Sequence, residues 1–209
     1  MIVLAVIVAL TFLLTFAGGS HVGAGWFWDT GNALGFVALA GLLFQMIPYA
    51  RGATTRRHEI LGYWVLGVGM LHAFWFLLGD GAVWTYLRPG APLAMWFGLA
   101  ALVVLAVLTA LARMPDRMRV HRRFRTFRTV HRVLGFALVA AAGLHVMLTG
   151  YYLGRWVQDV LFVLLVAATC LGRSRWARLG QAPIASGQTF VALGIAATSA
   201  FLLLRNLPW

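Results

Sequence analysis

The sequence predicts an all-α fold, a polytopic membrane helix bundle with a six-span core and a seventh, C-terminal span. Hydrophobic residues make up 62% of the 209 residues and charged residues only 11%, whereas soluble domains have about 45–50% and about 25%. Seven stretches are apolar enough to be spans, since a helix needs roughly 20 mostly apolar residues to cross a bilayer. The remaining charge is concentrated between these stretches, as in the loops of membrane proteins.

In chain order, the expected spans are 2–17, 32–50, 59–78, 92–112, 131–150, 156–172 and 188–204. No positive segment precedes the first stretch, so we expect a helix there and not a signal peptide. The longest connection, 113–130, is too short for a folded soluble domain. We therefore expect a single transmembrane domain over 1–209, without a nucleotide-binding domain. The single cysteine, Cys170, excludes disulfides within the chain and cysteine-ligated iron–sulfur centres.

The 17 basic residues, all arginine, indicate the orientation of the chain. With seven spans, 14 of them fall on one face: Arg51, Arg56, Arg57, Arg113, Arg117, Arg119, Arg122, Arg123, Arg125, Arg128, Arg132, Arg173, Arg175 and Arg178. The positive-inside rule places this face in the cytoplasm, with the N-terminus inside. Trp26, Trp28, Trp84, Trp156 and Trp209 then mark the outer interface. Because the net charge of +12 lies mainly in these loops, we expect contact with membrane lipid and no nucleic-acid partner.

Four histidines fall on two of the expected spans in two equally spaced pairs. His58 and His72 lie on the third span, and His131 and His145 lie on the fifth. Fourteen residues return a helix to within about 40° of its starting direction and advance it by about 21 Å. Since one span separates these two helices, they run in the same direction. We therefore expect His58 level with His131 near the cytoplasm, and His72 level with His145 toward the outside.

The two histidine segments also resemble each other in sequence. HEILGYWVLGVGMLH at 58–72 aligns without gaps on HRVLGFALVAAAGLH at 131–145. Small residues follow the first histidine on both, and they would let a flat ligand approach the backbone or let helices pack closely. They are Gly62, Gly67, Gly69, Gly135, Ala140, Ala141, Ala142 and Gly143.

Matched pairs at two depths predict two b-type haems, each held by two axial histidines, because haem iron accepts histidine and ionisable groups inside membranes are usually functional. Zinc is disfavoured, since two histidines per level do not complete a tetrahedral site. Two other functions stay open. One is a quinol-oxidising subunit similar to cytochrome b, and the other is a haem-free transporter or channel that uses the histidines as a proton relay.

At these residues the chain resembles the ferric reductase transmembrane domain superfamily, which includes NADPH oxidases, ferric-chelate reductases and the membrane subunit of the bacterial methionine-sulfoxide reductase system. The HxxLG openings at 58–62 and 131–135, the second histidines and a basic loop before the second pair carry the resemblance. It covers roughly 30–172 and leaves 188–204 as an additional span. It implies a membrane oxidoreductase subunit, in bacteria of the inner (plasma) membrane. His58 and His131 would bind the inner haem iron, and His72 and His145 the outer.

The resemblance also implies a direction of electron transfer, from the cytoplasm to the outer face. The oxidases and ferric reductases continue into a cytoplasmic flavin and nicotinamide domain that this chain lacks. The expected donor is therefore a separate cytoplasmic flavin reductase, which would bring the flavin, or membrane quinol. The expected acceptor is extracytoplasmic: a ferric chelate, oxygen or a partner reductase.

Arginines beside the first level of histidines have two interpretations. The segment 120–132 contains Arg122, Arg123, Arg125, Arg128 and Arg132. They could simply set the topology and contact anionic lipid. Alternatively, Arg128 or Arg132 pairs with haem propionates while the others dock an acidic flavoprotein. We expect this segment to lie as an interfacial amphipathic helix through Phe124 and Phe127, and we expect His121 at the surface. Arg88 or Arg155 could bind propionates at the outer level.

Overall fold

The computed structural model describes residues 1–16, 23–47, 53–79, 81–113, 124–172, 175 and 185–207, and no strand occurs among them. The elements are α1 (Ile2–Phe16), α2 (Trp26–Gln45), α3 (Ala53–Gly79), the 3-10 helix η1 (Gly81–Leu87), α4 (Leu93–Arg113), α6 (Phe124–Thr149), α7 (Trp156–Leu171) and α9 (Gly187–Asn206). The predicted all-α membrane bundle is confirmed, and each of the seven apolar stretches forms a helix.

Five of these helices are long and apolar enough to cross a membrane, namely α2, α3, α4, α6 and α9. The helices α1 and α7 are apolar but have only 15 and 16 residues. At 1.5 Å per residue they reach about 22–24 Å, against a hydrocarbon thickness of about 30 Å. Of the seven predicted spans, α1 and α7 are therefore shorter than the thickness of the hydrocarbon layer.

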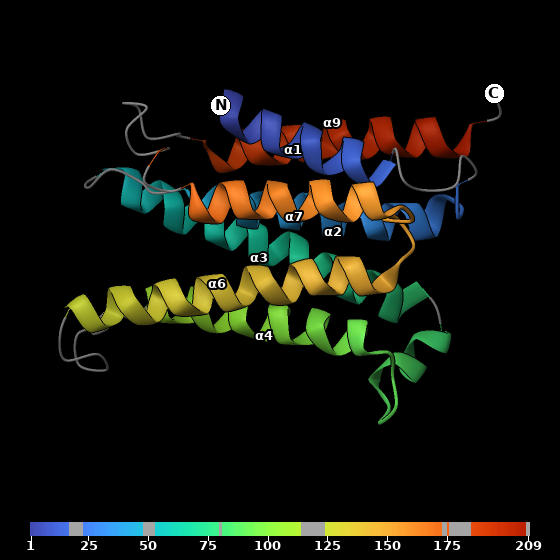
Figure 1. The fold of residues 1–209 in the computed structure, drawn as a ribbon, viewed down its shortest axis with the longest axis horizontal. Coiled ribbons are helices and arrows are strands. Elements are labelled where there is room, and N and C mark those ends of the chain that lie inside the picture. The colour runs from blue at the N-terminus through green and yellow to red at the C-terminus, as the bar shows by residue number, and fades with distance from the viewer. Residues whose placement is uncertain are drawn as a thin grey trace.

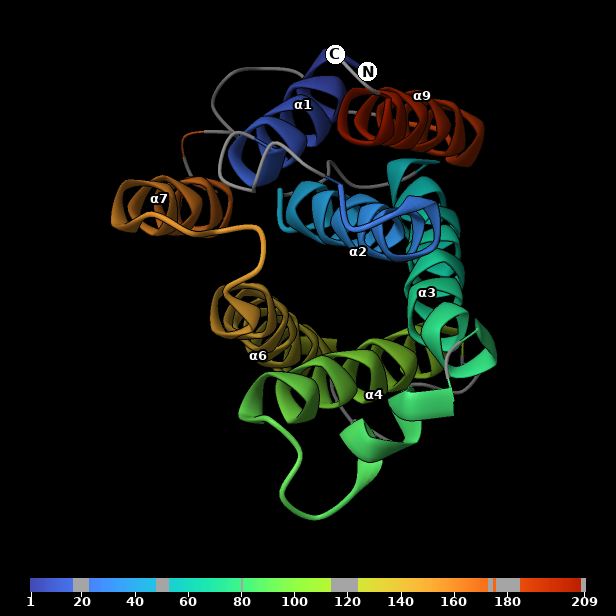
Figure 2. The ribbon, with the colours of Figure 1, turned by 90° about the vertical axis from the view of Figure 1, so that its right-hand side faces the viewer.

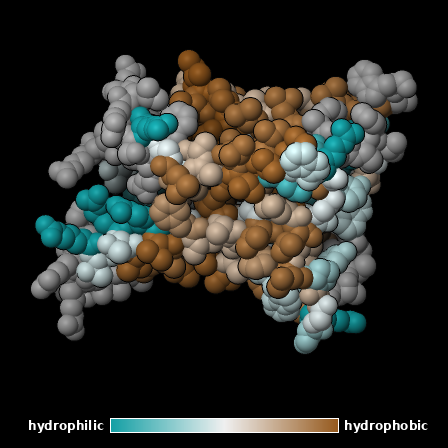
Figure 3. Space-filling view, in the orientation of Figure 1, coloured by the Kyte–Doolittle hydropathy of each residue, from teal (hydrophilic) through white to brown (hydrophobic). Residues whose placement is uncertain are grey.

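The long helices lie roughly parallel to one axis, and their direction alternates along the chain (Figure 1). As a result α3 and α6 run in the same direction, with α4 antiparallel to both. One end of the bundle carries Arg56, Arg113 and Arg125, and we call it the arginine end. The opposite end carries the exposed Trp26, Trp84 and Trp156, and we call it the tryptophan end. A hydrophobic band lies between the two ends (Figure 3), as expected of a protein embedded in lipid.

The helix α2 is the most buried of the set and lies among the others (Figure 2). It packs against α1, α3 and α9, while α4 packs closely against α6. Close approach is possible because α2 and α9 have glycines at their contacts: a Cβ on Gly41 would meet Val65 and Phe190, and one on Gly194 would meet Val37. Small residues at helix contacts are the usual means of packing in membranes.

Three helices begin earlier than the hydropathy of the sequence predicts. We expected a span at 32–50, but α2 begins at Trp26 and includes Asp29 in its first turn. The predicted spans at 59–78 and 131–150 begin at Ala53 and Phe124. The arginine-rich turns extend these two helices because long side chains can reach the interface from inside a continuous helix. We predicted an interfacial helix around Phe124 and Phe127. This prediction is wrong for residues 124–130, because they form the first turns of the continuous helix α6.

Candidate functional site

The structure brings the four histidines together as two pairs between α3 and α6. The ring centres of His58 and His131 lie 6.1 Å apart, with an angle of 66° between the ring planes. Those of His72 and His145 lie 6.3 Å apart, at 68°. The pairing by depth agrees with the spacing in the sequence, because 14 residues separate the two histidines on each helix. The two levels lie about 21 Å apart along the helix axis.

His72 and His145 each contact a backbone carbonyl of a neighbouring helix through Nδ1. The nitrogen of His72 lies 2.7 Å from the oxygen of Gly31 on α2, and that of His145 lies 2.8 Å from the oxygen of Ala94 on α4. A carbonyl oxygen can only accept a hydrogen bond, so each Nδ1 carries the proton and donates. The neutral ring then keeps its lone pair on Nε2. This is the tautomer in which metal-binding histidines are usually held.

Both rings also lie directly against a glycine. A Cβ on Gly35 would come within 2.8 Å of Cε1 of His72, and one on Gly98 within 2.9 Å of Nδ1 of His145. Real Cβ atoms do not approach neighbours so closely, so an alanine at either position would displace the ring. Gly35 and Gly98 were not singled out from the sequence, because they lie on helices that carry no histidine.

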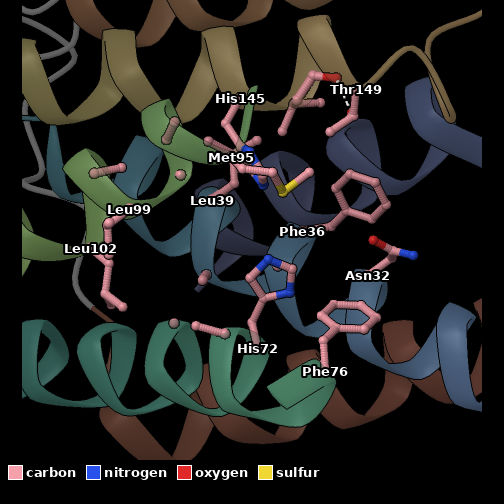
Figure 4. Close-up of a pocket in the computed structure, with 18 of the residues that line it drawn as sticks. Asn32, Phe36, Leu39, His72, Phe76, Met95, Leu99, Leu102, His145 and Thr149 are labelled. Atoms are coloured by element: carbon pink, nitrogen blue, oxygen red, sulfur yellow. Dashed lines mark hydrogen bonds between the residues drawn. The ribbon is translucent and has the colours of Figure 1, made fainter. Parts of the chain in front are cut away.

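A cavity of about 780 Å³ surrounds the His72–His145 pair. Figure 4 shows His72 extending from α3 and His145 from α6, pointing toward each other across this space. Aromatic and aliphatic side chains of α2, η1, α4 and α6 complete the wall, and no Asp, Glu, Arg or Lys of the described residues lines it. Cavities of roughly 300–1,000 Å³ with mostly apolar walls and a few polar groups are typical sites for cofactors.

The His58–His131 level has room near the backbone as well. A Cβ on Gly62 would have only the amide of Gln45 within 4 Å, and one on Gly135 only the sulfur of Met46. The Gln45 Nε2 atom is buried and has no hydrogen-bond partner among the described residues. The ring of Phe127 lies 5.6 Å from that of His131, at 31°. The glycines of the two HxxLG segments thus face the end of α2.

The other predicted small residues divide between two environments. Gly69 lines the cavity at the His72 level. Gly67 is exposed and a Cβ there would meet nothing within 4 Å, so it faces away from the histidines. The expectation that it would admit a flat ligand is therefore wrong.

The predicted arginine sites receive different support from their positions. Arg128 and Arg132 are both exposed in the first turns of α6. Arg128 precedes His131 by three residues and so shares its face of the helix, whereas Arg132 is turned about 100° away. Arg122, Arg123 and His121 lie outside the described residues. Arg88 and Arg155 are exposed and do not line the cavity.

A buried polar cluster near the tryptophan end was missed from the sequence. Asp29 of α2 and Arg205 of α9 are 0% and 3% exposed, and Arg205 Nε lies 3.3 Å from Oδ1 of Asp29. Tyr152 donates to the same oxygen at 2.8 Å, and Asn206 donates to Oδ2 at 2.9 Å. The Arg205 guanidinium also lies over the rings of Tyr152 and Phe201. The cluster ties α2, α9 and the α6–α7 connection together.

Tyr152 links this cluster to the cavity. It lines the cavity and packs edge-on against Phe36, with ring centres 5.1 Å apart. Burial, together with the hydrogen bond to Asp29, raises the pKa of Tyr152 well above its ordinary value. The phenol therefore stays neutral and keeps donating to Asp29 at any physiological pH.

Two features of the geometry thus define the candidate site: paired histidines at two levels, and a largely apolar cavity around the second pair. Among the described residues, no three His, Cys, Asp or Glu side chains are grouped closely enough to hold a bare metal ion. Searches with models of known protein families, curated sequences and solved structures find nothing that matches this chain, so its geometry is what bears on its function.

Proposed function

We propose that this chain is a transmembrane electron-transfer protein that binds two b-type haems, one between His58 and His131 and one between His72 and His145. It would take electrons from a separate cytoplasmic flavin reductase or from membrane quinol. It would deliver them to an extracytoplasmic acceptor, such as a ferric chelate, oxygen or a partner reductase. Each haem, when bound, would supply a reversible one-electron couple between ferric and ferrous iron.

The separation of the paired rings is the observation that carries this proposal. Two axial bonds of about 2 Å, with roughly a further 1 Å from each nitrogen to its ring centre, place two coordinating imidazoles roughly 6 Å apart. The separations of 6.1 and 6.3 Å agree with this value. At the His72 level, Nδ1 donates to a carbonyl on both sides, which leaves both Nε2 lone pairs for iron.

The residues around the His72 level suit a porphyrin in other respects. The apolar walls would suit the ring faces of a porphyrin, and no charged side chain of the described residues lines the cavity to compete for the iron. At the arginine end, Arg128 shares the face of His131 and is the better placed of the two arginines for a propionate. In the direction proposed, the arginine end faces the cytoplasm and the N-terminus lies on that side.

A pyridine haemochrome assay against protein concentration tests the central claim. We expect two haems b per chain, with the low-spin absorbance of bis-histidine ligation. A stoichiometry near one would leave one pair of histidines without its proposed role. Protein that folds and contains no haem would contradict the proposal and favour the histidine proton relay.

Dependence on a separate donor gives a second prediction. The isolated chain should not oxidise NAD(P)H, whereas dithionite or a supplied flavin reductase should reduce its haems. If basic residues at the start of α6 dock an acidic reductase, the reduction rate should fall as salt is raised, because charges are screened over about 10 Å at 0.1 M.

Stopped-flow reduction by the reductase at several salt concentrations measures this effect. Arg125→Gln should slow reduction at low salt. Arg88→Gln, an equal change of charge at the tryptophan end, should leave the rate unchanged. Rapid NADPH oxidation by the pure chain would contradict the need for a donor, and equal effects of both substitutions would contradict docking at the arginine end.

A further inference from the structure

We propose that α2 and α4, which carry no histidine ligand, preset the orientation and redox potential of the His72–His145 site through two matching backbone cradles. Each cradle consists of a carbonyl and the glycine four residues later. Gly31 and Gly35 form the α2 cradle, and Ala94 and Gly98 form the α4 cradle. The inference rests on the proposed function and assigns positioning roles to residues outside the ligand helices.

The two cradles have the same construction. In the first, Nδ1 of His72 is 2.7 Å from the Gly31 oxygen while the ring lies on Gly35. In the second, Nδ1 of His145 is 2.8 Å from the Ala94 oxygen while the ring lies on Gly98. The same relation thus occurs twice on two different helices, toward two histidines that face each other.

Helix geometry explains why the glycine must follow the carbonyl by four residues. In an α-helix the carbonyl of residue i accepts from the N–H of residue i+4, and it has a second lone pair that can accept from another donor. The side chain of residue i+4 would stand beside that second lone pair. At Gly35 and Gly98 no side chain is present, so the imidazole reaches the carbonyl and contacts the glycine.

The cradles affect both the position and the electronic character of the ligands. Holding each ring from a neighbouring helix fixes its rotation about the axis that points to the iron. A hydrogen bond from Nδ1 to a carbonyl increases the basicity of Nε2, which favours ferric over ferrous iron and lowers the reduction potential. The α2 and α4 backbones would therefore make a haem bound between His72 and His145 a stronger reductant than the two histidines alone would make it.

Gly35→Ala and Gly98→Ala test this role, with Gly67→Ala as the matched control. Gly67 is also helical, but a Cβ there meets nothing within 4 Å. We expect each cradle variant to weaken haem binding at the His72 level by about 10- to 100-fold, the usual effect of losing a partner behind a metal ligand. Any haem that stays should show a more positive midpoint potential and altered low-spin EPR g-values. The His58-level haem and the control should match the wild type.

The thermal midpoint of haem-free protein separates positioning from packing. Positioning predicts that the variants lose more stability in the haem-loaded than in the haem-free form. Equal losses in both forms, with both haems retained at wild-type potentials, would overturn the inference. Because Gly35 lies on α2 and Gly98 on α4, either alanine variant tests the positioning role if the other does not fold. If the wild-type protein folds and binds no haem, the proposed function itself is wrong, whatever the cradle variants do.

Discussion

His72→Ala and His145→Ala are each expected to remove the outer haem completely and to leave the inner one. Each substitution deletes one of the two histidines proposed as ligands, whose ring centres lie 6.3 Å apart. The described residues hold no group of three His, Cys, Asp or Glu side chains that could bind a metal ion in their place. His58→Ala and His131→Ala should have the converse effect, since their ring centres lie 6.1 Å apart at the other level. Redox titration followed by visible absorbance measures which component is lost.

Loss of the outer haem should also abolish transfer across the membrane. In proteoliposomes with the reductase confined to the cytoplasmic side, the wild type should reduce a ferric chelate or oxygen on the opposite side, and His72→Ala should not. His121→Ala is the control, because the sequence predicts a surface position for that residue. If His58→Ala and His72→Ala abolished the same spectral component, the pairing by depth would be wrong. Acceptor reduction only on the reductase side would refute transmembrane transfer.

Asp29→Ala is expected to destabilise the folded chain by about 3–5 kcal/mol, the usual effect of removing one partner from a buried ion pair. Arg205 would then remain buried without the carboxylate it contacts at 3.3 Å. Tyr152 and Asn206 would lose their acceptor in the same step. Thermal and denaturant unfolding in detergent, followed by circular dichroism, measures the change.

Two further variants separate the buried pair from a general effect of charge. Asp159→Ala removes a carboxylate that also lies in the first turn of a helix but is only partly buried, and should cost about 1 kcal/mol or less. The double substitution Asp29→Leu with Arg205→Met should recover part of the stability lost in Asp29→Ala, because apolar residues can replace a buried pair with little cost. Equal losses for Asp29→Ala and Asp159→Ala would show that the cluster contributes little.

Hydropathy and histidine spacing predicted most of the helices and the pairing of the rings. Seven apolar stretches became seven helices, because the bilayer requires long apolar segments with internally satisfied backbones. The matched interval of 14 residues placed His58 beside His131 and His72 beside His145, since it depends only on helix geometry and on the parallel direction of α3 and α6. The haems and the electron-transfer function stay predictions.

The parts that the sequence did not predict depend on contacts between distant segments. Apolar composition alone does not place Asp29 inside a helix, and its partner Arg205 lies 176 residues away, so α2 was expected to begin too late. Gly35 and Gly98 carry no local signal, because their role depends on which histidine the fold brings against them. Local hydropathy also cannot distinguish a charged first turn of a helix from a loop, which is why α6 begins at Phe124 and not near His131.

The pair formed by Asp29 and Arg205 has a consequence for the biogenesis of the chain. A ribosome makes α2 long before α9, and chains emerge from the N-terminus. During that interval Asp29 lacks the cation that it contacts in the folded chain, and burying an unpaired carboxylate is costly. Tyr152, made between the two, can donate to it before translation reaches Arg205. The buried cluster at the tryptophan end is therefore completed only when α9 inserts.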